Sequence, residues 1–392
     1  MIERNLTRTL ETRATQYPVV AVTGPRQSGK TTLCQAVFPD RPYVSLEAED
    51  AREYAKVDPR GFLSEYQDGA VLDEVQRAPH LLSYLQGLVD EDPTPGRFIL
   101  TGSQHFGLSE AISQSLAGRV GILHLLPLAL DELGRFDEHP SGLLEVLWAG
   151  AYPRIHDRGI PADVWLRDYF STYIQRDVRQ VLQVADLEAF ATFMRLAAGR
   201  TGAEINLSGL GADAGIRHNT ARSWLSVLET SFLITRIPAW HRNVRKQQIK
   251  APKLHFLDSG LVCFLLGIRT PKELQHQPLT GLIIERWVVS EVFKRRVHQG
   301  LEPRLFHYRE AQGLEVDLVV DLGLRKILGE VKAGATVNQD FIRNLQRLGD
   351  AIQQAESGGE IIPRLVYGGE QGQRRTNIEV IPWSGINGLP WE

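Results

Sequence analysis

The stretch VVAVTGPRQSGKTTL occupies residues 19–33 of the chain. Its octet GPRQSGKT, at residues 24–31, fits the spacing G-x-x-x-x-G-K-[ST] and lies between an apolar run typical of a strand and a segment typical of a helix. Glycines allow backbone N–H groups to close around phosphate oxygens, and the helix adds the partial positive charge of its N-terminus. The alternative is a tight turn that only joins a strand to a helix. The strand–loop–helix context favours a triphosphate-binding loop.

The side chains of this loop suit ATP with Mg²⁺. Lys30 is expected to reach the β- and γ-phosphates, and the Thr31 hydroxyl is expected to bind Mg²⁺. The predicted nucleotide contacts are Gly24, Pro25, Arg26, Gln27, Ser28, Gly29, Lys30, Thr31 and Thr32.

Short apolar runs alternate with helical segments through the first 130 residues. Strands are expected at residues 19–24, 43–47, 69–75, 97–103 and 120–126. Runs that are apolar at nearly every position are typical of strands buried on both faces. The pattern predicts an α/β fold in which helices cover both faces of a parallel sheet.

The third expected strand ends in two acids, Asp73 and Glu74. Two adjacent carboxylates at the end of a buried strand are costly unless they serve a site. Asp73 is predicted to hold Mg²⁺ through water. Glu74 is predicted to orient or deprotonate the attacking water, which favours hydrolysis over a kinase reaction. The alternative is that the pair caps a strand at its solvated end.

These motifs, taken together with others along the chain, make the sequence resemble a known family. The segments GPRQSGKTT, AVLDEVQ, ILTGSQ, SLAGR, GAYP, YIQRDV, APKLHFLDSGL and EVDLVV…GEVK occur in order and span nearly the whole chain. Residues 1–130 resemble an AAA+-type P-loop ATPase of the AAA_14 kind, and the whole chain is similar to bacterial and archaeal proteins that add a DUF4143 domain. The expected continuation is a helical lid at 131–200, a winged helix with a basic hairpin at 201–255, and an α/β domain of the PD-(D/E)XK, or restriction-endonuclease-like, fold at 256–392.

The resemblance implies further roles around the nucleotide. Ser103, or alternatively Thr101, ends the fourth strand at the place of a γ-phosphate sensor. Arg119 precedes the fifth strand, where the family has an arginine that projects into a neighbour's nucleotide and stabilises charge on the transferred phosphoryl group. That role requires a ring or helical homo-oligomer, for example a hexamer; otherwise Arg119 is an ordinary surface arginine. Pro153, with Gly150, resembles an element beside the adenine, or forms only a turn.

Alternating acids mark the carboxyl-terminal domain. Glu330 and Lys332 share one face of their strand, and Asp317 lies beside Glu330 if the two strands form an antiparallel hairpin. Close carboxylates repel unless a cation bridges them, and oxygen ligands suit Mg²⁺ or Mn²⁺. Glu285 is predicted to complete the cluster, with Glu315 as an alternative ligand, while Lys332 activates water for phosphodiester cleavage. The pattern resembles PD-(D/E)XK nucleases; an exposed strand, or a clamp that binds DNA without cutting it, are the alternatives.

A helix-turn-helix outline at residues 204–240 precedes the basic segment HRNVRKQQIKAPK at 241–253. Such a hairpin suits binding to the phosphate backbone of DNA, by shape more than by base sequence. Otherwise the segment is a solvated linker and the helices dock a protein. The predicted DNA contacts are Arg222, Arg242, Arg245, Lys246, Lys250 and Lys253.

The composition of the chain excludes several classes of protein. The chain has 44 Lys and Arg against 47 Asp and Glu, which excludes a protein that coats nucleic acid by bulk charge. Its two cysteines cannot make a disulfide framework, and no apolar run approaches the ~20 residues of a membrane helix. The first residues show no apolar secretion signal. We therefore expect a cytoplasmic protein with no membrane partner.

Two functional hypotheses fit these patterns. In the first, an oligomeric ATPase binds and remodels DNA, including branched DNA, and its tail cuts DNA with Mg²⁺. In the second, the chain is a nucleotide-switched scaffold or signalling protein whose tail binds DNA or protein without chemistry.

Overall fold

The computed structural model describes residues 2–103, 112, 114–174, 186–241, 250–310, 313–338, 340–355, 359–375 and 378–392. The chain forms two compact units. Unit 1 comprises Met1–Leu128, Thr230–Phe232 and Val297–Leu301, and unit 2 comprises Ala129–Glu229, Leu233–Arg296 and Glu302–Glu392. Within the part of the chain that is described, no helix has the length and apolar character needed to cross a membrane.

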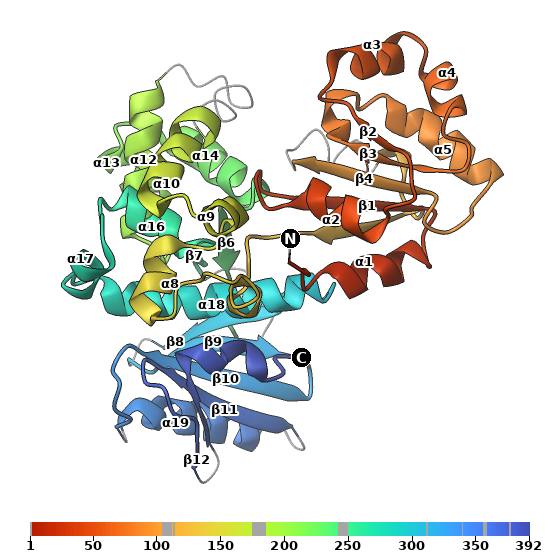
Figure 1. The fold of residues 1–392 in the computed structure, drawn as a ribbon. Helices are drawn as coiled ribbons and strands as arrows, with labels where there is room; N and C mark the ends of the chain where they lie inside the picture. Colours follow the sequence, from red (N-terminus) through yellow and green to blue (C-terminus); the bar gives the residue numbers. More distant parts are fainter. Residues whose placement is uncertain are drawn as a thin grey trace. The chain divides into compact units, whose positions relative to one another are not determined.

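Unit 1 is built on a five-stranded sheet (Figure 1). Its strands are paired in parallel in the order β2-β3-β4-β1-β5. The predicted parallel sheet is therefore confirmed. β1 lies between β4 and β5. Because the three strands are parallel, their carboxyl ends lie at the same edge of the sheet. The strands are β1 (Val19–Gly24), β2 (Tyr43–Ser45), β3 (Ala70–Asp73), β4 (Phe98–Ser103) and β5 (Val120–His124).

Helices cover both faces of this sheet and create two separate cores. Val20 and Val22 pack with Leu33 on one face, while Val19 and Ala21 pack with the leucines of α5 on the other. This is why β1 is apolar at every position before its terminal threonine and glycine. The helices are α1 (Thr7–Ala14), α2 (Lys30–Val37), α3 (Glu49–Val57), α4 (Pro59–Ser64) and α5 (Leu81–Glu91), with a 3₁₀ turn η1 (Val75–Arg77).

Unit 2 begins with helices. They are α7 (Leu130–Leu133), α8 (Leu143–Ala149), α9 (Pro153–Arg158), α10 (Ala162–Tyr169), the π-helix η2 (Phe170–Ile174), α12 (Leu187–Gly199), α13 (Leu207–Asp213), α14 (His218–Thr230), α16 (Ser259–Leu265), α17 (Pro271–Gln275) and α18 (Thr280–His298). The last residues of α18 belong to unit 1.

The predicted helix-turn-helix outline is present in α13 and α14. Two antiparallel strands follow, β6 (Ile234–Ile237) and β7 (Lys253–Phe256). The sequence KLHF therefore pairs with β6 and lies outside the carboxyl-terminal sheet. The lid falls within unit 2, and so do the helix-turn-helix region and the tail apart from Thr230–Phe232 and Val297–Leu301. Their division at residues 200 and 255 stays a prediction.

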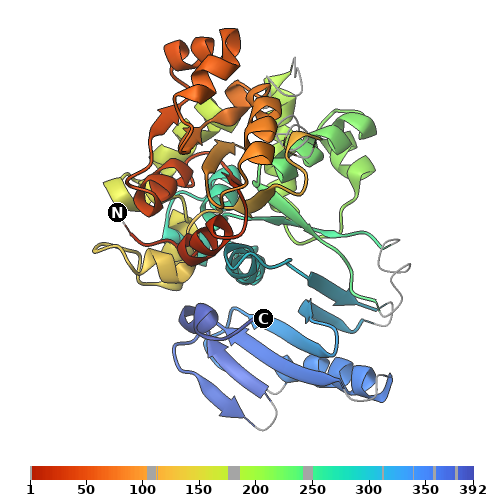
Figure 2. The ribbon, with the colours of Figure 1, turned by 90° about the vertical axis from the view of Figure 1, so that its right-hand side faces the viewer.

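The carboxyl-terminal part of unit 2 is a mixed sheet of order β12-β13-β11-β10-β9-β8. The predicted antiparallel hairpin is confirmed, with Leu318 opposite Gly329. Figure 2 shows α19 along one face of this sheet, where Leu345 and Leu348 pack against Val319. The elements are β8 (Leu305–Arg309), β9 (Glu315–Asp321), β10 (Arg325–Lys332), α19 (Asp340–Ala355), β11 (Glu360–Tyr367), β12 (Gln373–Arg375), β13 (Ile378–Pro382) and η3 (Trp383–Gly388).

Candidate functional site

The phosphate loop connects the end of β1 to the start of α2. A Cβ atom on Gly24 would lie 2.2 Å from the Leu125 carbonyl oxygen, and Gly29 has φ +93°, so both positions require glycine. Lys30 is buried, and its Nζ donates to the carbonyl oxygens of Gly24 at 3.2 Å and Pro25 at 2.8 Å. Burial lowers the pKa of Lys30 to about 8. The lysine thus folds back over the loop that it is predicted to bridge to phosphate.

Two buried hydroxyls around this loop lack a partner among the residues that the structure describes. Within that part of the chain, the Oγ atoms of Ser28 and Ser103 make no hydrogen bond. Ser103 pairs with Gly24 across β4 and β1, so it lies beside the first residue of the loop. Unpaired buried hydroxyls are costly, and phosphate oxygens would accept from them. The loop residues therefore fit a triphosphate. Ser103 lies at the carboxyl edge of the sheet beside the loop, and its role as a sensor stays a prediction.

Asp73, at the end of β3, is the centre of a hydrogen-bond cluster. Its Oδ1 accepts from the Thr31 hydroxyl at 2.8 Å, and its Oδ2 accepts from the Tyr43 hydroxyl at 2.9 Å. The Thr101 hydroxyl also donates to Oδ1. Thr31 and Asp73 supply the hydroxyl and carboxylate oxygens that Mg²⁺ prefers, so these two residues fit the ion. The sequence patterns did not identify Tyr43.

Glu74 follows with a left-handed backbone conformation, φ +57°. Such a conformation is uncommon for a residue with a side chain and clusters at functional positions. Its N–H donates to the Thr101 hydroxyl at 3.4 Å, and Gln76 donates to its carboxylate. Burial raises the pKa of Glu74, which suits a group that accepts a proton from water.

The structure also describes two other residues that were predicted around the nucleotide, Arg119 and Pro153. Arg119, just before β5, forms an ion pair with Asp90, with Nη2 2.9 Å from Oδ2. Pro153 is the first residue of α9 in unit 2, behind Gly150, which has φ +71°. The roles of Arg119 and Pro153 toward nucleotide remain predictions.

The predicted acids of the tail lie together in unit 2. Asp317 accepts from the Val331 N–H at 2.9 Å, and Lys332 donates to Glu330 at 2.6 Å. Burial, and then the charge of Asp317, raises the pKa of both Glu285 and Glu330. Such shifts are expected where buried carboxylates crowd one another.

These acids do not form a ready metal cage. Where side chains are described, no three His, Cys, Asp or Glu residues are arranged to hold a metal ion. Glu285 pairs with Arg286 at 2.5 Å, while Glu315, the alternative ligand, pairs with Lys253 at 2.7 Å. The metal roles of Glu285, Asp317 and Glu330 therefore stay a prediction.

The predicted DNA contacts divide into three groups. Arg222 on α14 and Lys250 before β7 are exposed. Lys253 is only 2% exposed and is paired with Glu315, so the expectation that it meets DNA is wrong: a buried, neutralised lysine cannot reach a phosphate. Arg242, Arg245 and Lys246 lie outside the described residues.

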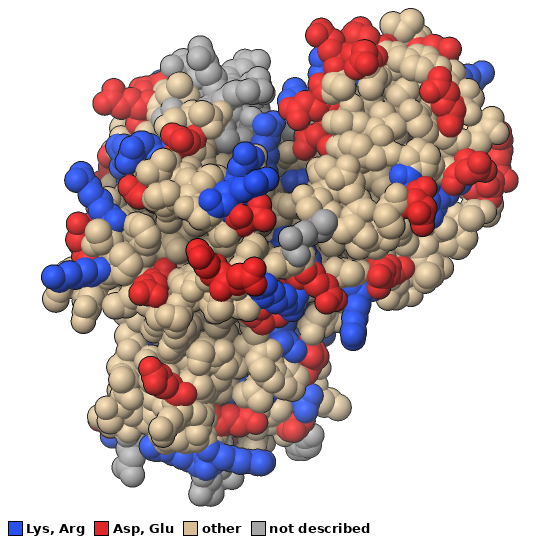
Figure 3. All heavy atoms as spheres, viewed as in Figure 1, with Lys and Arg blue, Asp and Glu red and all other residues tan. Residues whose placement is uncertain are grey.

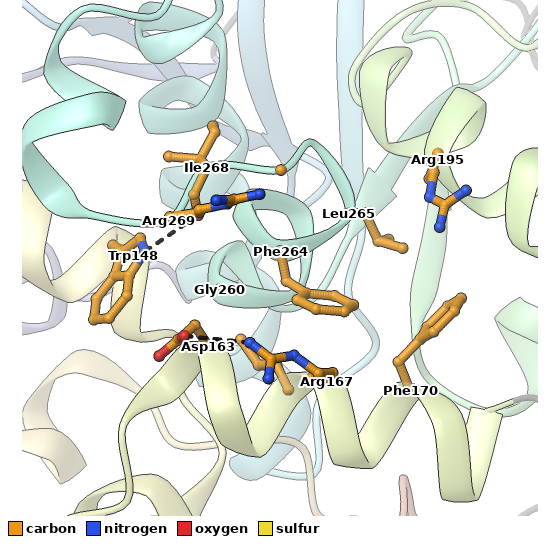
Figure 4. A pocket seen from close by; sticks show the side chains of 12 residues that line it. Trp148, Asp163, Arg167, Phe170, Arg195, Gly260, Phe264, Leu265, Ile268 and Arg269 are labelled. Atoms are coloured by element: carbon orange, nitrogen blue, oxygen red, sulfur yellow. Dashed lines mark hydrogen bonds and ion pairs between the residues drawn. The ribbon is translucent and has the colours of Figure 1, made fainter.

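A cavity of about 620 Å³ lies in unit 2, between α10 on one side and α16 with its following segment on the other (Figure 4). Trp148 and Phe264 contribute apolar surface, and Arg195 and Arg269 contribute positive charge. Arg167 at its edge pairs with Asp163 at 3.6 Å. None of the residues predicted from the sequence lines this cavity.

Three domain families match the chain. An AAA domain matches residues 16–134, and two domains of unknown function, DUF8612 and DUF4143, match residues 141–272 and 280–386. The AAA match contains the phosphate loop, Asp73 and Glu74, and such a domain implies ATP binding. The resemblance to an AAA_14 ATPase joined to DUF4143 is therefore confirmed. The DUF8612 match covers most of the segments predicted as lid and winged helix.

Solved structures of ATPases resemble parts of the chain at low sequence identity. A Walker-type ATPase of Pyrococcus abyssi is 16% identical with a TM-score of 0.47, and the match covers 68% of this chain and 96% of the other. AMPPCP-bound DnaA of Aquifex aeolicus is 17% identical with a TM-score of 0.30, and the match covers 57% of this chain and 85% of the other.

Two relatives match over a longer stretch of sequence. They are uncharacterized proteins of Mycobacterium bovis and Mycobacterium tuberculosis, each 31% identical over 329 residues, which are 81% of this chain and 71% of theirs. The chain therefore belongs to the family of these mycobacterial proteins, and its amino-terminal domain is an AAA-type P-loop ATPase domain.

Proposed function

We propose that the chain hydrolyses ATP at the carboxyl edge of β1 and β3 and that unit 2 couples this turnover to DNA. The observation that carries the first part is the 2.8 Å hydrogen bond between Thr31 and Asp73, which joins the phosphate loop to the acid pair. In the family of P-loop ATPases, this junction is where the triphosphate and its metal meet.

Each residue of the site has a chemical task. The loop N–H groups and Lys30 bind the phosphates. The Ser28 and Ser103 hydroxyls, which have no acceptor among the described residues, donate to phosphate oxygens. Thr31 and Asp73 hold Mg²⁺, which when bound offsets charge on the phosphates. Glu74 orients a water molecule and takes its proton, a task that its raised pKa supports.

Removal of the proposed base tests the reaction. Glu74→Gln should bind a fluorescent ATP analogue normally but lose turnover by about 10²-fold or more, since general-base catalysis contributes that much. Glu91→Gln, an exposed change at the end of α5, is the matched control. A Glu74→Gln protein that hydrolyses ATP at the wild-type rate would remove Glu74 from this role.

Support for DNA binding comes from the exposed surface of α14. Arg217, Asn219 and Arg222 are all exposed near the start of this helix, as a recognition helix requires. By contrast, acidic residues gather over α3 in unit 1, on the face that Figure 3 shows. We therefore assign DNA contact to unit 2.

A DNA panel tests the coupling. Single-stranded, duplex and branched DNA are added to the ATPase assay at several salt concentrations, and the best DNA should raise turnover. Arg222→Gln should weaken binding and lower the salt dependence by about one phosphate contact. Arg236→Gln on β6, an exposed arginine already paired with Glu229, is the control. If no DNA binds or stimulates, the second candidate, a nucleotide-switched scaffold, becomes the better description.

A further inference from the structure

The segment ahead of α1 contacts the phosphate loop through Arg4. This arginine is 6% exposed and lies outside the 16–134 range that the AAA domain family matches. Its Nη1 donates to the Ser28 carbonyl oxygen at 2.6 Å, and its Nη2 donates to the Leu126 carbonyl oxygen at 3.0 Å. A Cβ atom on Gly29 would lie 3.4 Å from the same Nη1. The guanidinium therefore lies directly against the loop.

The bond to Ser28 controls the direction of one loop amide. The Ser28 carbonyl and the Gly29 N–H belong to the same planar peptide unit, and in a trans unit the two groups point in opposite directions. No cis peptide bond occurs among the residues described. Because the Ser28 carbonyl points toward Arg4, the Gly29 N–H must point away from Arg4. Glycine alone would restrain this peptide weakly.

The second carbonyl gives the arginine a fixed anchor. The Leu126 N–H donates to Nε2 of His298 at 3.1 Å, and His298 is fully buried. The His298 carbonyl oxygen in turn accepts from the Thr9 hydroxyl at 2.9 Å. Leu126 is thus held through both its backbone groups, so Arg4 connects the loop to a part of unit 1 that is itself fixed.

An arginine is the suitable residue for this connection. Its rigid fork carries N–H groups on separate nitrogens, so one side chain can satisfy two carbonyls from segments far apart in sequence, which a lysine with its single nitrogen does less well. Its charge is permanent, and it adds a positive potential behind a loop that binds a triphosphate.

We propose that Arg4 is a positioning residue for ATP binding, which aims the Gly29 N–H at the phosphates by holding the Ser28 carbonyl. The proposal rests on ATP binding by this loop. It does not make Arg4 a catalytic residue, because Arg4 acts through the backbone.

The test compares Arg4→Lys, Arg4→Ala and the control Arg8→Ala, an exposed arginine on α1. Affinity for a fluorescent ATP analogue, kcat, KM and the melting temperature are measured for each. Arg4→Lys should stay folded and raise both the dissociation constant and KM by about tenfold, while kcat changes much less. Arg8→Ala should match the wild type. If Arg4→Ala does not fold, the comparison of Arg4→Lys with the wild type tests the proposal.

The NMR signal of the Gly29 amide distinguishes a positioning role of Arg4 from a purely structural one. In protein labelled with ¹⁵N-glycine, the Gly29 resonance is identified by its loss in Gly29→Ala. ATP should shift this resonance in the wild type and shift it less in Arg4→Lys. A folded Arg4→Lys protein with wild-type affinity, or one that loses only thermal stability, overturns the proposal. If the wild type itself does not bind the analogue, the ATPase assignment fails instead.

Discussion

Thr31 and Asp73, 42 residues apart in the chain, meet through a hydrogen bond of 2.8 Å at the edge of the sheet. Thr31 is the second residue of α2 and the last of the phosphate-loop octet, and Asp73 ends β3. The contact exists because all five strands run in parallel, so that their carboxyl ends share one edge. Thr31 and Asp73 are the residues that would hold Mg²⁺, which would offset charge on the phosphates.

Tyr43 is expected to stabilise unit 1 through its contact with Asp73. Tyr43→Phe removes one donor to a buried carboxylate, while the Thr31 and Thr101 donors remain. The loss should be about 1 kcal/mol, below the roughly 1.5–3 kcal/mol of a buried hydrogen bond to a charged group because Tyr43 is 39% exposed, and should lower the melting temperature of unit 1 by about 3 °C. Calorimetry measures this drop in melting temperature. Tyr84→Phe, an exposed tyrosine on α5, is the control, and an equal drop in both variants would contradict the idea.

The sequence patterns were sufficient to predict a structural feature where a motif and its local context agree. The loop at residues 24–31 and the acid pair that ends β3 are local signals, and the parallel sheet follows from alternating strands and helices. Given an antiparallel hairpin, the period of two along each strand places Asp317 beside Glu330. These features depend on neighbours in the chain, which a single sequence displays.

Contacts between distant segments could not be foreseen in the same way. The run HRNVRKQQIKAPK is basic throughout, yet Lys253 is buried because β7 pairs with β6 and brings it to Glu315, 62 residues away. Tyr43 and Arg4 act through partners that no spacing rule connects to them. Only the fold determines such pairs.

Arg119 is predicted to act on the nucleotide of a neighbouring subunit. Its ion pair with Asp90 is partly exposed, and water screens pairs of that kind, so the arginine can leave it at little cost. Arg119→Ala should bind ATP but lose most turnover, since an arginine supplied in trans contributes about 10³-fold or more. Steady-state hydrolysis and analogue binding measure the two effects.

Mixing two inactive variants tests whether the arginine acts in trans. Arg119→Ala keeps Glu74, and Glu74→Gln keeps Arg119, so a mixed oligomer contains sites with both residues. Activity should reappear on mixing and should depend on protein concentration. Asp90→Asn, which only frees Arg119, should keep turnover. If mixing restores nothing, Arg119 is an ordinary surface arginine.

The tail carboxylates are expected to take up a divalent cation. Mn²⁺ should raise the melting temperature of the wild type because it relieves repulsion among Glu285, Asp317 and Glu330. Asp317→Asn should abolish this shift, and EDTA should reverse it. Asp340→Asn, an exposed acid on α19, is the control. If Mn²⁺ binds and Lys332→Ala removes plasmid nicking, the tail is a nuclease. If Mn²⁺ shifts nothing, the cluster is structural.

His124, at the end of β5, should make unit 1 less stable in mild acid. Its Nδ1 lies 2.7 Å from the Thr23 hydroxyl, and its ring centre lies 4.9 Å from that of Phe232. Burial lowers the pKa of His124 to about 4 from an ordinary value of 6.5. Between these two values the unfolded chain binds a proton that the folded chain does not. The stabilisation is therefore complete above pH 6.5 and is lost as the pH falls toward 4.

The loss of unfolding free energy in acid has an upper limit of about 3 kcal/mol, because folding lowers the pKa of His124 from 6.5 to about 4. His124→Asn keeps a polar atom near Thr23 but cannot titrate, so it should flatten the pH dependence within this window. Hydrogen exchange of the β1 amides measures the stability of unit 1 separately from the buried histidines of unit 2. The difference between wild type and variant should be constant above pH 7 and should change steadily between pH 6.5 and 4. A constant difference across the whole range would show that His124 is protonated as readily in the folded protein as in the unfolded one.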